Sequence, residues 1–121
     1  MANPFVHVEL NTTDIAKAKA FYGALFGWKQ QDVPMGGGRN YTMVDVGDGT
    51  GGGMQAHPVD GAPSAWLAYV NVDDLKASTE KARKLGATVM REPMEVMGMG
   101  SLSIIVDPTG AVLGLWQEGA K

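Results

Sequence analysis

The two halves of the sequence repeat one pattern. Each half opens on an apolar, strand-like stretch, passes an acidic residue, and continues into an amphipathic helical segment that ends at glycine. These parts are Phe5–Leu10, Asp14, Ile15–Phe26 and Gly27 in the first half, and Trp66–Val72, Asp73–Asp74, Leu75–Leu85 and Gly86 in the second. The offset is about 60 residues, and an internal duplication is the simplest explanation.

Three strand-like stretches follow each helical segment. They cover residues 28–32, 41–46 and 52–57, then 88–91, 101–106 and 111–117, with a four-residue turn at Asp107–Gly110. This order predicts an α+β fold of two tandem β-α-β-β-β modules, at about 4–57 and 65–118, within one domain spanning 1–121. The modules should form curved mixed sheets, with the helices on the convex side and a concave cleft on the other.

Composition excludes several classes of protein. The net charge is −3 and the basic residues are scattered, which argues against a nucleic-acid partner. The sequence contains no cysteine, so thiol catalysis, disulfides and thiolate metal sites are excluded. No secretory signal and no run long enough to cross a bilayer is visible, so we expect no membrane partner and a cytoplasmic location. The glycines at 36–38 and 51–53 lack the Gly-Lys-Ser/Thr ending of a phosphate loop.

Several motifs make the sequence similar to a known family. They are His7-Val-Glu-Leu10, Ala20-Phe-Tyr-Gly-Ala-Leu-Phe-Gly-Trp28, Val72-Asp-Asp-Leu75, Leu85-Gly-Ala87 and Asp107-Pro-Thr-Gly-Ala-Val-Leu-Gly-Leu-Trp-Gln117. With these motifs the chain resembles the vicinal oxygen chelate superfamily, which holds glyoxalase I, extradiol dioxygenases, bleomycin-resistance proteins and methylmalonyl-CoA epimerase. It most resembles the short, glyoxalase-related branch of that superfamily.

The resemblance implies a divalent metal held by ligands on the first and last strands of each module. The metal would take two substrate oxygens and stabilise an anion as a Lewis acid. In this sequence His7 occupies the first ligand position and Gln55 offers a weak donor at the second, whereas Leu67 and Gly114 occupy the other two. A stable transition-metal site uses about three or four donors, so we expect no complete metal site and no other cofactor.

Alternation along the first strand places His7 and Glu9 on the face opposite Val8 and Leu10. We predict that His7 and Glu9 form the catalytic pair, as a general base or as an anchor for a polar ligand. Glu9→Gln is expected to weaken ligand binding and to leave folding nearly intact. Four further residues are predicted to bind the ligand in the same cavity: Gln55, Tyr69, Asn71 and Trp116, the last with its ring over Gly114.

These features favour a small-molecule-binding protein that acts as a homodimer. A divalent-metal-assisted lyase or isomerase acting on an α-hydroxycarbonyl substrate is the first alternative, with its missing ligands supplied by water, substrate or the other subunit. A non-catalytic drug-sequestering protein is the second. Trp28 and Trp66 are assigned to the core or to subunit contacts.

Overall fold

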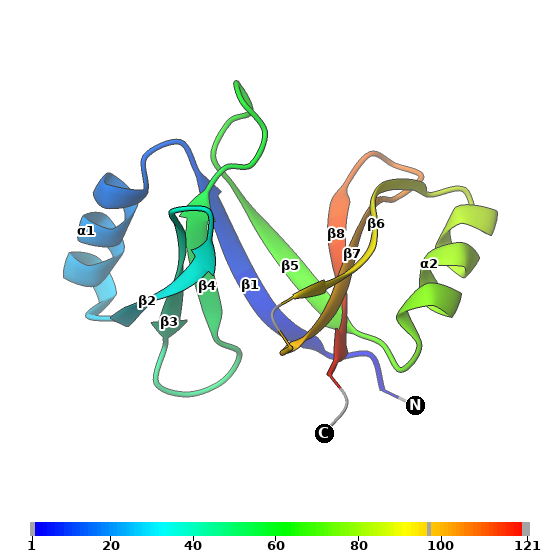
Figure 1. Ribbon diagram of the computed structural model, residues 1–121, viewed down its shortest axis with the longest axis horizontal. Helices are drawn as coiled ribbons and strands as arrows, with labels where there is room; N and C mark the ends of the chain where they lie inside the picture. The colour runs from blue at the N-terminus through cyan, green and yellow to red at the C-terminus, as the bar shows by residue number, and fades with distance from the viewer. Residues whose placement is uncertain (1, 97, 120–121) are drawn as a thin grey trace. The chain divides into compact units, whose positions relative to one another are not determined.

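The computed structural model describes residues 2–96 and 98–119. The first half contains β1 (Phe5–Thr12), α1 (Ile15–Phe26), β2 (Lys29–Gly36), β3 (Arg39–Asp45) and β4 (Gly52–Ala56). The second half contains β5 (Ala65–Asn71), α2 (Leu75–Lys84), β6 (Thr88–Val96), β7 (Gly100–Val106) and β8 (Val112–Glu118). The predicted α+β fold with two β-α-β-β-β modules is confirmed (Figure 1).

Two strands continue at least four residues beyond their predicted ends, and both contain proline. β2 continues through Pro34 to Gly36, and β6 continues through Pro93 to Val96. Each lies at an end of its sheet order, where a residue without an N–H removes no hydrogen bond to a second neighbour. The sequence prediction ended these strands too early because it treated proline and glycine as loop signals.

The chain forms two compact units. One is His7–Leu67, and the other joins the described residues before His7 to Ala68 and the chain after it. Within the first unit the strand order is β2-β3-β4-β1, with β1 and β4 parallel and the other pairs antiparallel. The second unit has the equivalent order β6-β7-β8-β5, with β5 and β8 parallel.

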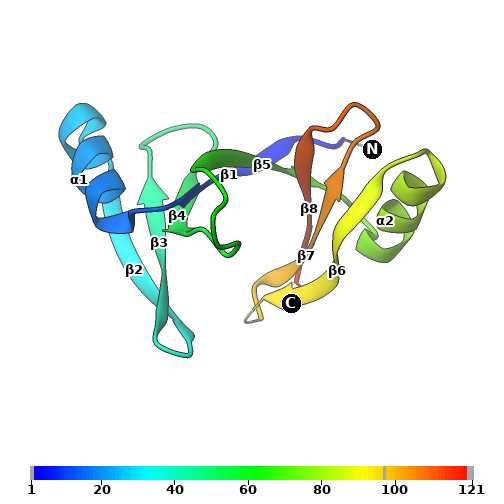
Figure 2. The ribbon, with the colours of Figure 1, turned by 90° about the horizontal axis from the view of Figure 1, so that it is seen from above.

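Each helix packs on one face of its own sheet (Figure 2). α1 has the predicted bounds, and α2 ends one residue before the predicted Leu85. The side chains of Asp14 and Asp74 cap α1 and α2 by accepting backbone N–H bonds at 3.0 and 3.1 Å. Gly27 ends α1 in the left-handed conformation, with φ 69°. Neither helix has the length and apolar character that a bilayer-crossing helix requires.

Each unit has its own hydrophobic core between helix and sheet. The buried residues are Leu10, Ala18, Val44 and Met54 in the unit His7–Leu67, and Val72, Leu75, Ile105 and Leu115 in the other. In β1 the core residue Leu10 alternates with the polar residues Glu9 and Asn11. The two faces of the first sheet therefore differ in chemistry, with the apolar face under α1.

Aromatic rings cover glycines on both sheets. A side chain added at Gly114 would collide with the ring of Tyr69, which pairs with it across β5 and β8. The same holds for Gly53 under Tyr41 and for Gly100 under Trp116. These glycines are therefore required for close packing rather than for an unusual backbone conformation.

Gly114→Ala should destabilise the protein because its methyl group would displace the buried ring of Tyr69, which is 4% exposed. We expect a loss of about 1–3 kcal/mol in the free energy of unfolding and a fall of at least ~4 °C in Tm. The control is Gly23→Ala in α1, whose added Cβ would lie 3.4 Å from Gln30 Nε2, an ordinary van der Waals distance. This control should not lower Tm, because alanine favours helix. Equal Tm values for Gly114→Ala and the wild type would contradict the packing described.

Candidate functional site

The polar face of β1 carries His7, Glu9 and Asn11. Glu9 is 6% exposed and Asn11 is 8% exposed, although both are polar and lie in a strand. A buried carboxylate is costly unless its oxygens accept hydrogen bonds. Glu9 therefore needs hydrogen-bond donors on this face.

One oxygen of Glu9 is joined to His7 through a tyrosine. Tyr41 Oη donates to Glu9 Oε1 at 3.0 Å, and His7 Nε2 lies 2.7 Å from Tyr41 Oη. Since the hydroxyl has one proton and directs it to the carboxylate, His7 Nε2 must be the donor in the other bond. The neutral imidazole then carries its basic lone pair on Nδ1. His7 and Glu9 are thus linked through Tyr41.

The second oxygen of Glu9 accepts from two amides. Asn11 Nδ2 lies 3.1 Å and Gln55 Nε2 lies 3.4 Å from Glu9 Oε2. Gln55 Nε2 also donates to Asn11 Oδ1 at 2.9 Å, which fixes both amide orientations. We call these five side chains, His7, Glu9, Asn11, Tyr41 and Gln55, the polar network. Its donors satisfy both oxygens of the buried carboxylate.

Burial lowers the pKa of His7 below its usual value of 6.5, because a charged imidazolium loses hydration in this site. His7 is therefore predominantly neutral at pH 7. A neutral histidine can accept a proton from a bound molecule, whereas an imidazolium cannot.

Tyr41 is the network member that the sequence analysis missed. It lies on β3, and its ring occupies the space that a side chain at Gly53 would fill. Gly53 in turn pairs with Glu9 on β1 and with Met43 on β3. Gly53, in the stretch 51–53 that we excluded as a phosphate loop, thus makes room for the tyrosine. The sequence signal that could have identified Tyr41 was a tyrosine on the polar face of a strand, next to a strand that contains a glycine.

Three predicted ligand-binding residues lie in the other unit. Tyr69 is buried and its ring covers Gly114, while the half-buried Trp116 covers Gly100. The expectation that Trp116 lies over Gly114 is therefore wrong, because Tyr69 is the direct cross-strand partner of Gly114. Asn71 is half-buried. Its backbone N–H donates to Pro4 O at 2.9 Å, and its backbone carbonyl accepts from Asn3 Nδ2 at 2.9 Å. The meeting of these residues with His7 in one cavity stays a prediction.

The donor set does not fit a protein-held transition metal. Leu67 is an apolar, buried residue, and the ring of Tyr69 takes the space beside Gly114. Within residues 2–96 and 98–119 no three His, Cys, Asp or Glu side chains gather closely enough to hold a metal ion. His7 Nε2, moreover, is engaged with Tyr41. No step of a mechanism is therefore assigned to a metal.

Glu9→Gln should lower Tm by several degrees, corresponding to about 1–3 kcal/mol, because an amide cannot accept from all the groups that now donate to the carboxylate. This replaces the sequence-based expectation of nearly intact folding, which assumed a carboxylate facing an open cleft. Thermal unfolding followed by circular dichroism measures the change. The matched control is Glu95→Gln, at an exposed strand position, which should keep the wild-type Tm. Equal Tm values for the two variants would show that Glu9 is not held as described.

Comparison with known proteins finds one family that matches most of the chain. The family model described as Glyoxalase/Bleomycin resistance protein/Dioxygenase superfamily matches residues 5–115. CFP32 of Mycobacterium tuberculosis, a glyoxylase by name, is 40% identical over 114 residues, covering 91% of this chain and 44% of that protein. The anthracycline biosynthesis protein DnrV of Streptomyces peucetius is 29% identical, covering 92% of this chain and 46% of that protein. The chain thus spans less than half the length of these curated relatives.

Solved structures share the fold at low sequence identity. Methylmalonyl-CoA epimerase from Mycobacterium tuberculosis has a TM-score of 0.71 and 17% identity, over 96% of this chain and 88% of that chain. A hypothetical protein of Bacillus halodurans, BH1468, has a TM-score of 0.74 and 11% identity, over 100% of this chain and 98% of that chain. At these identities the likeness establishes the fold alone.

Proposed function

The chain belongs to the glyoxalase/bleomycin resistance protein/dioxygenase superfamily, and from that premise we propose that it binds a small organic molecule at the polar network. In this proposal His7 takes a proton from the bound molecule without a protein-held metal. The observation that carries the proposal is the hydrogen-bonded chain from His7 through Tyr41 to the buried carboxylate of Glu9.

Each member of this chain has a definite part in the proposal. The lowered pKa keeps His7 neutral, with Nδ1 as the accepting nitrogen. When Nδ1 takes a proton, the imidazolium keeps donating its Nε2–H to Tyr41 Oη. The Tyr41 hydroxyl donates in turn to the Glu9 carboxylate, and so links the charged ring to that carboxylate. The charge that forms on His7 is thereby stabilised by an anion held in place before the reaction. Asn11 and Gln55 hold that anion and are positioning residues.

A metal-assisted lyase or isomerase acting on an α-hydroxycarbonyl substrate is the first alternative. It is supported by the fold likeness to methylmalonyl-CoA epimerase, which is an isomerase by name. It requires ligands beyond His7 and Gln55, and these would have to come from water, substrate or a second subunit. The polar network needs no such addition, and we therefore prefer the proton-transfer proposal.

Ligand binding without turnover is the second alternative. The ring of Tyr41 lies over Gly53 and offers an aromatic surface beside the amide of Gln55. Such a surface suits a flat molecule, and the relative DnrV is named for anthracycline biosynthesis. The two proposals differ in whether the bound molecule exchanges a proton.

Other expectations from the sequence also stand as proposals. We propose a homodimer, a cytoplasmic location, and one functional domain containing the modules at about 4–57 and 65–118.

The proposal predicts metal-independent binding and proton exchange. Protein treated with EDTA should gain thermal stability from at least one member of a panel of glycolaldehyde, hydroxyacetone and short 2-oxo acids. In D2O the same compound should lose its α-hydrogen signal in proton NMR faster with wild-type protein than without it. His7→Gln and Tyr41→Phe should each slow this exchange by at least about tenfold, which corresponds to ~1.4 kcal/mol.

The controls separate the three functions. Exchange that appears only after Mn²⁺, Ni²⁺ or Zn²⁺ is added would support the metal-assisted alternative and contradict the proposal. A rise in Tm without any exchange would support binding without turnover. Exposed Glu95→Gln should behave as wild type in both measurements.

A further inference from the structure

The first sheet carries a hollow that takes no part in the polar network. Its volume is about 350 Å³, and the described residues that line it all belong to the unit His7–Leu67. Val8 on β1 is one of them. Since side chains alternate along a strand, Val8 points away from its neighbours His7 and Glu9. The hollow therefore lies on the apolar face of this sheet, opposite the polar network.

A glycine keeps this hollow open. Gly52 on β4 pairs with the core residue Val44 on β3. Its equivalent in the second module is Leu113 on β8, which pairs with the core residue Ile105 on β7. Both come directly before a strand glycine that an aromatic ring covers. Leu113 packs its side chain on the core of its unit, whereas the first module has no side chain at this place.

Strand β4 cannot fill the space from this position. A Cβ added at Gly52 would collide with the backbone oxygen of Val8, because the two strands approach closely there. An apolar group that fills the hollow therefore has to come from elsewhere.

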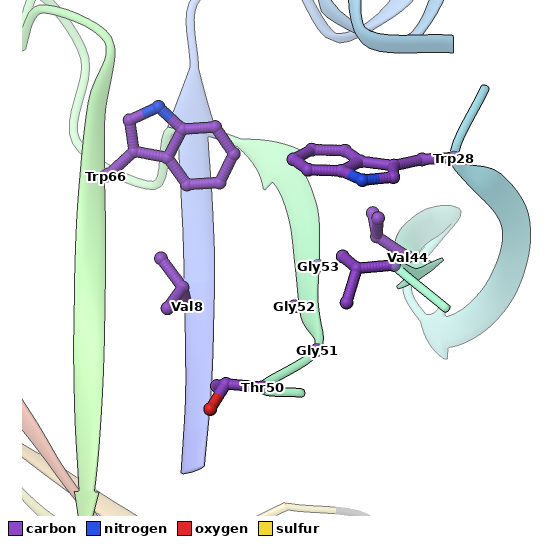
Figure 3. Close-up of a pocket in the computed structure, with 9 residues that line it drawn as sticks. Val8, Trp28, Val44, Thr50, Gly51, Gly52, Gly53 and Trp66 are labelled. Carbon is purple, nitrogen blue, oxygen red and sulfur yellow. The ribbon is translucent and has the colours of Figure 1, made fainter. Parts of the chain in front are cut away.

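Two tryptophans border the hollow. Trp28 directly precedes β2 and is half-buried, and Trp66 on β5 is 44% exposed. The ring of Tyr22 in α1 holds both of them, with centroid distances of 5.7 Å to Trp28 and 5.5 Å to Trp66. Figure 3 shows the two indole rings at one end of the hollow and Thr50 at the other. Two indole rings held in place offer a flat molecule a large apolar contact area at little cost in side-chain entropy.

The lining also selects against charge. Valines, glycines, the two indoles and the Thr50 hydroxyl surround the hollow, and none of the described lining residues is charged. A charged molecule would lose hydration there without gaining an ion pair. Pockets for small organic molecules typically hold about 300–1,000 Å³, so this hollow suits one or two fused rings. A stable protein interface instead covers about 800 Å² on each partner, an area that a hollow of this size does not provide.

We propose that the hollow is a second binding site, which takes an uncharged aromatic molecule of one or two fused rings. The molecule lies against Trp28 and Trp66 and fills the place that Leu113 takes in the second module. Its binding removes apolar surface of the sheet from water. This site goes beyond the proposed function, because the polar network and the described lining residues have no member in common.

Proton–nitrogen NMR spectra recorded with 2-naphthol as the probe test this site. The indole N–H signals of Trp28 and Trp66 should shift and saturate with a Kd of about 1 mM or below, a range that ligands of this size reach. Trp116, the third tryptophan of the chain, lies in the other unit, and its signal should not shift. The compound 2-naphthalenesulfonate has the same rings with a permanent charge and should bind at least about tenfold more weakly.

Two substitutions remove the site in different ways. Trp66→Ala deletes one of the rings, and Val8→Phe puts a side chain into the hollow. Each should raise the Kd of 2-naphthol at least about tenfold. Trp66→Phe keeps a ring and should stay within about threefold of the wild type. Leu85→Ala, at a residue that is 70% exposed in the other unit, is the matched control and should keep the wild-type Kd.

The outcomes separate this site from the polar network and from a protein partner. Shifts confined to His7, Tyr41 or Trp116 would place the probe elsewhere and overturn the second site. Signals of Trp28 and Trp66 that move with protein concentration, and not with the probe, would mean that another protein molecule covers the hollow, and would overturn it as well. His7→Gln should keep the Kd of 2-naphthol while it slows proton exchange at the polar network, so either proposal can fail without the other.

Discussion

The burial of the Glu9 carboxylate is the constraint on which the candidate site depends. A carboxyl group that is 6% exposed stays in a strand only if hydrogen-bonding partners surround it. Tyr41, Asn11 and Gln55 provide them, and Tyr41 reaches Glu9 only because Gly53 has no side chain. The same tyrosine then accepts the hydrogen bond from His7 Nε2–H. Positioning of the histidine thus follows from satisfying the carboxylate.

The two modules carry different side chains at equivalent positions. Glu9 pairs with Gly53 across β1 and β4, and Tyr69 pairs with Gly114 across β5 and β8. In the first pair a tyrosine from a third strand fills the space over the glycine and binds the carboxylate. In the second, Tyr69 itself fills that space with its ring. Both modules therefore have a strand glycine with an aromatic cover, while the polar chemistry is found beside Glu9. Helices α1 and α2 differ as well, because the exposed residues of α1 are mostly apolar and those of α2 are mostly charged.

The sequence predicted the fold well because the signals were local and repeated. Asp14, Gly27 and Asp74 marked helix ends, and alternation along β1 separated Leu10 from Glu9. The polar network was predicted only in part, since Tyr41 comes from a strand some 30 residues away and its contact with Glu9 depends on Gly53. Strand register decides such contacts, and composition does not encode it directly. The same limit explains why Trp116 was placed over the wrong glycine.

The NMR signals of the His7 imidazole test the central claim most directly. At pH 7 a long-range nitrogen–proton correlation spectrum should show a neutral ring protonated at Nε2, and its titration midpoint should lie below the usual 6.5. In Tyr41→Phe the Nε2–H tautomer preference should weaken, because the hydroxyl that accepts from it is absent. A ring protonated at Nδ1, or a midpoint above 6.5, would contradict the hydrogen-bonded chain from His7 to Glu9.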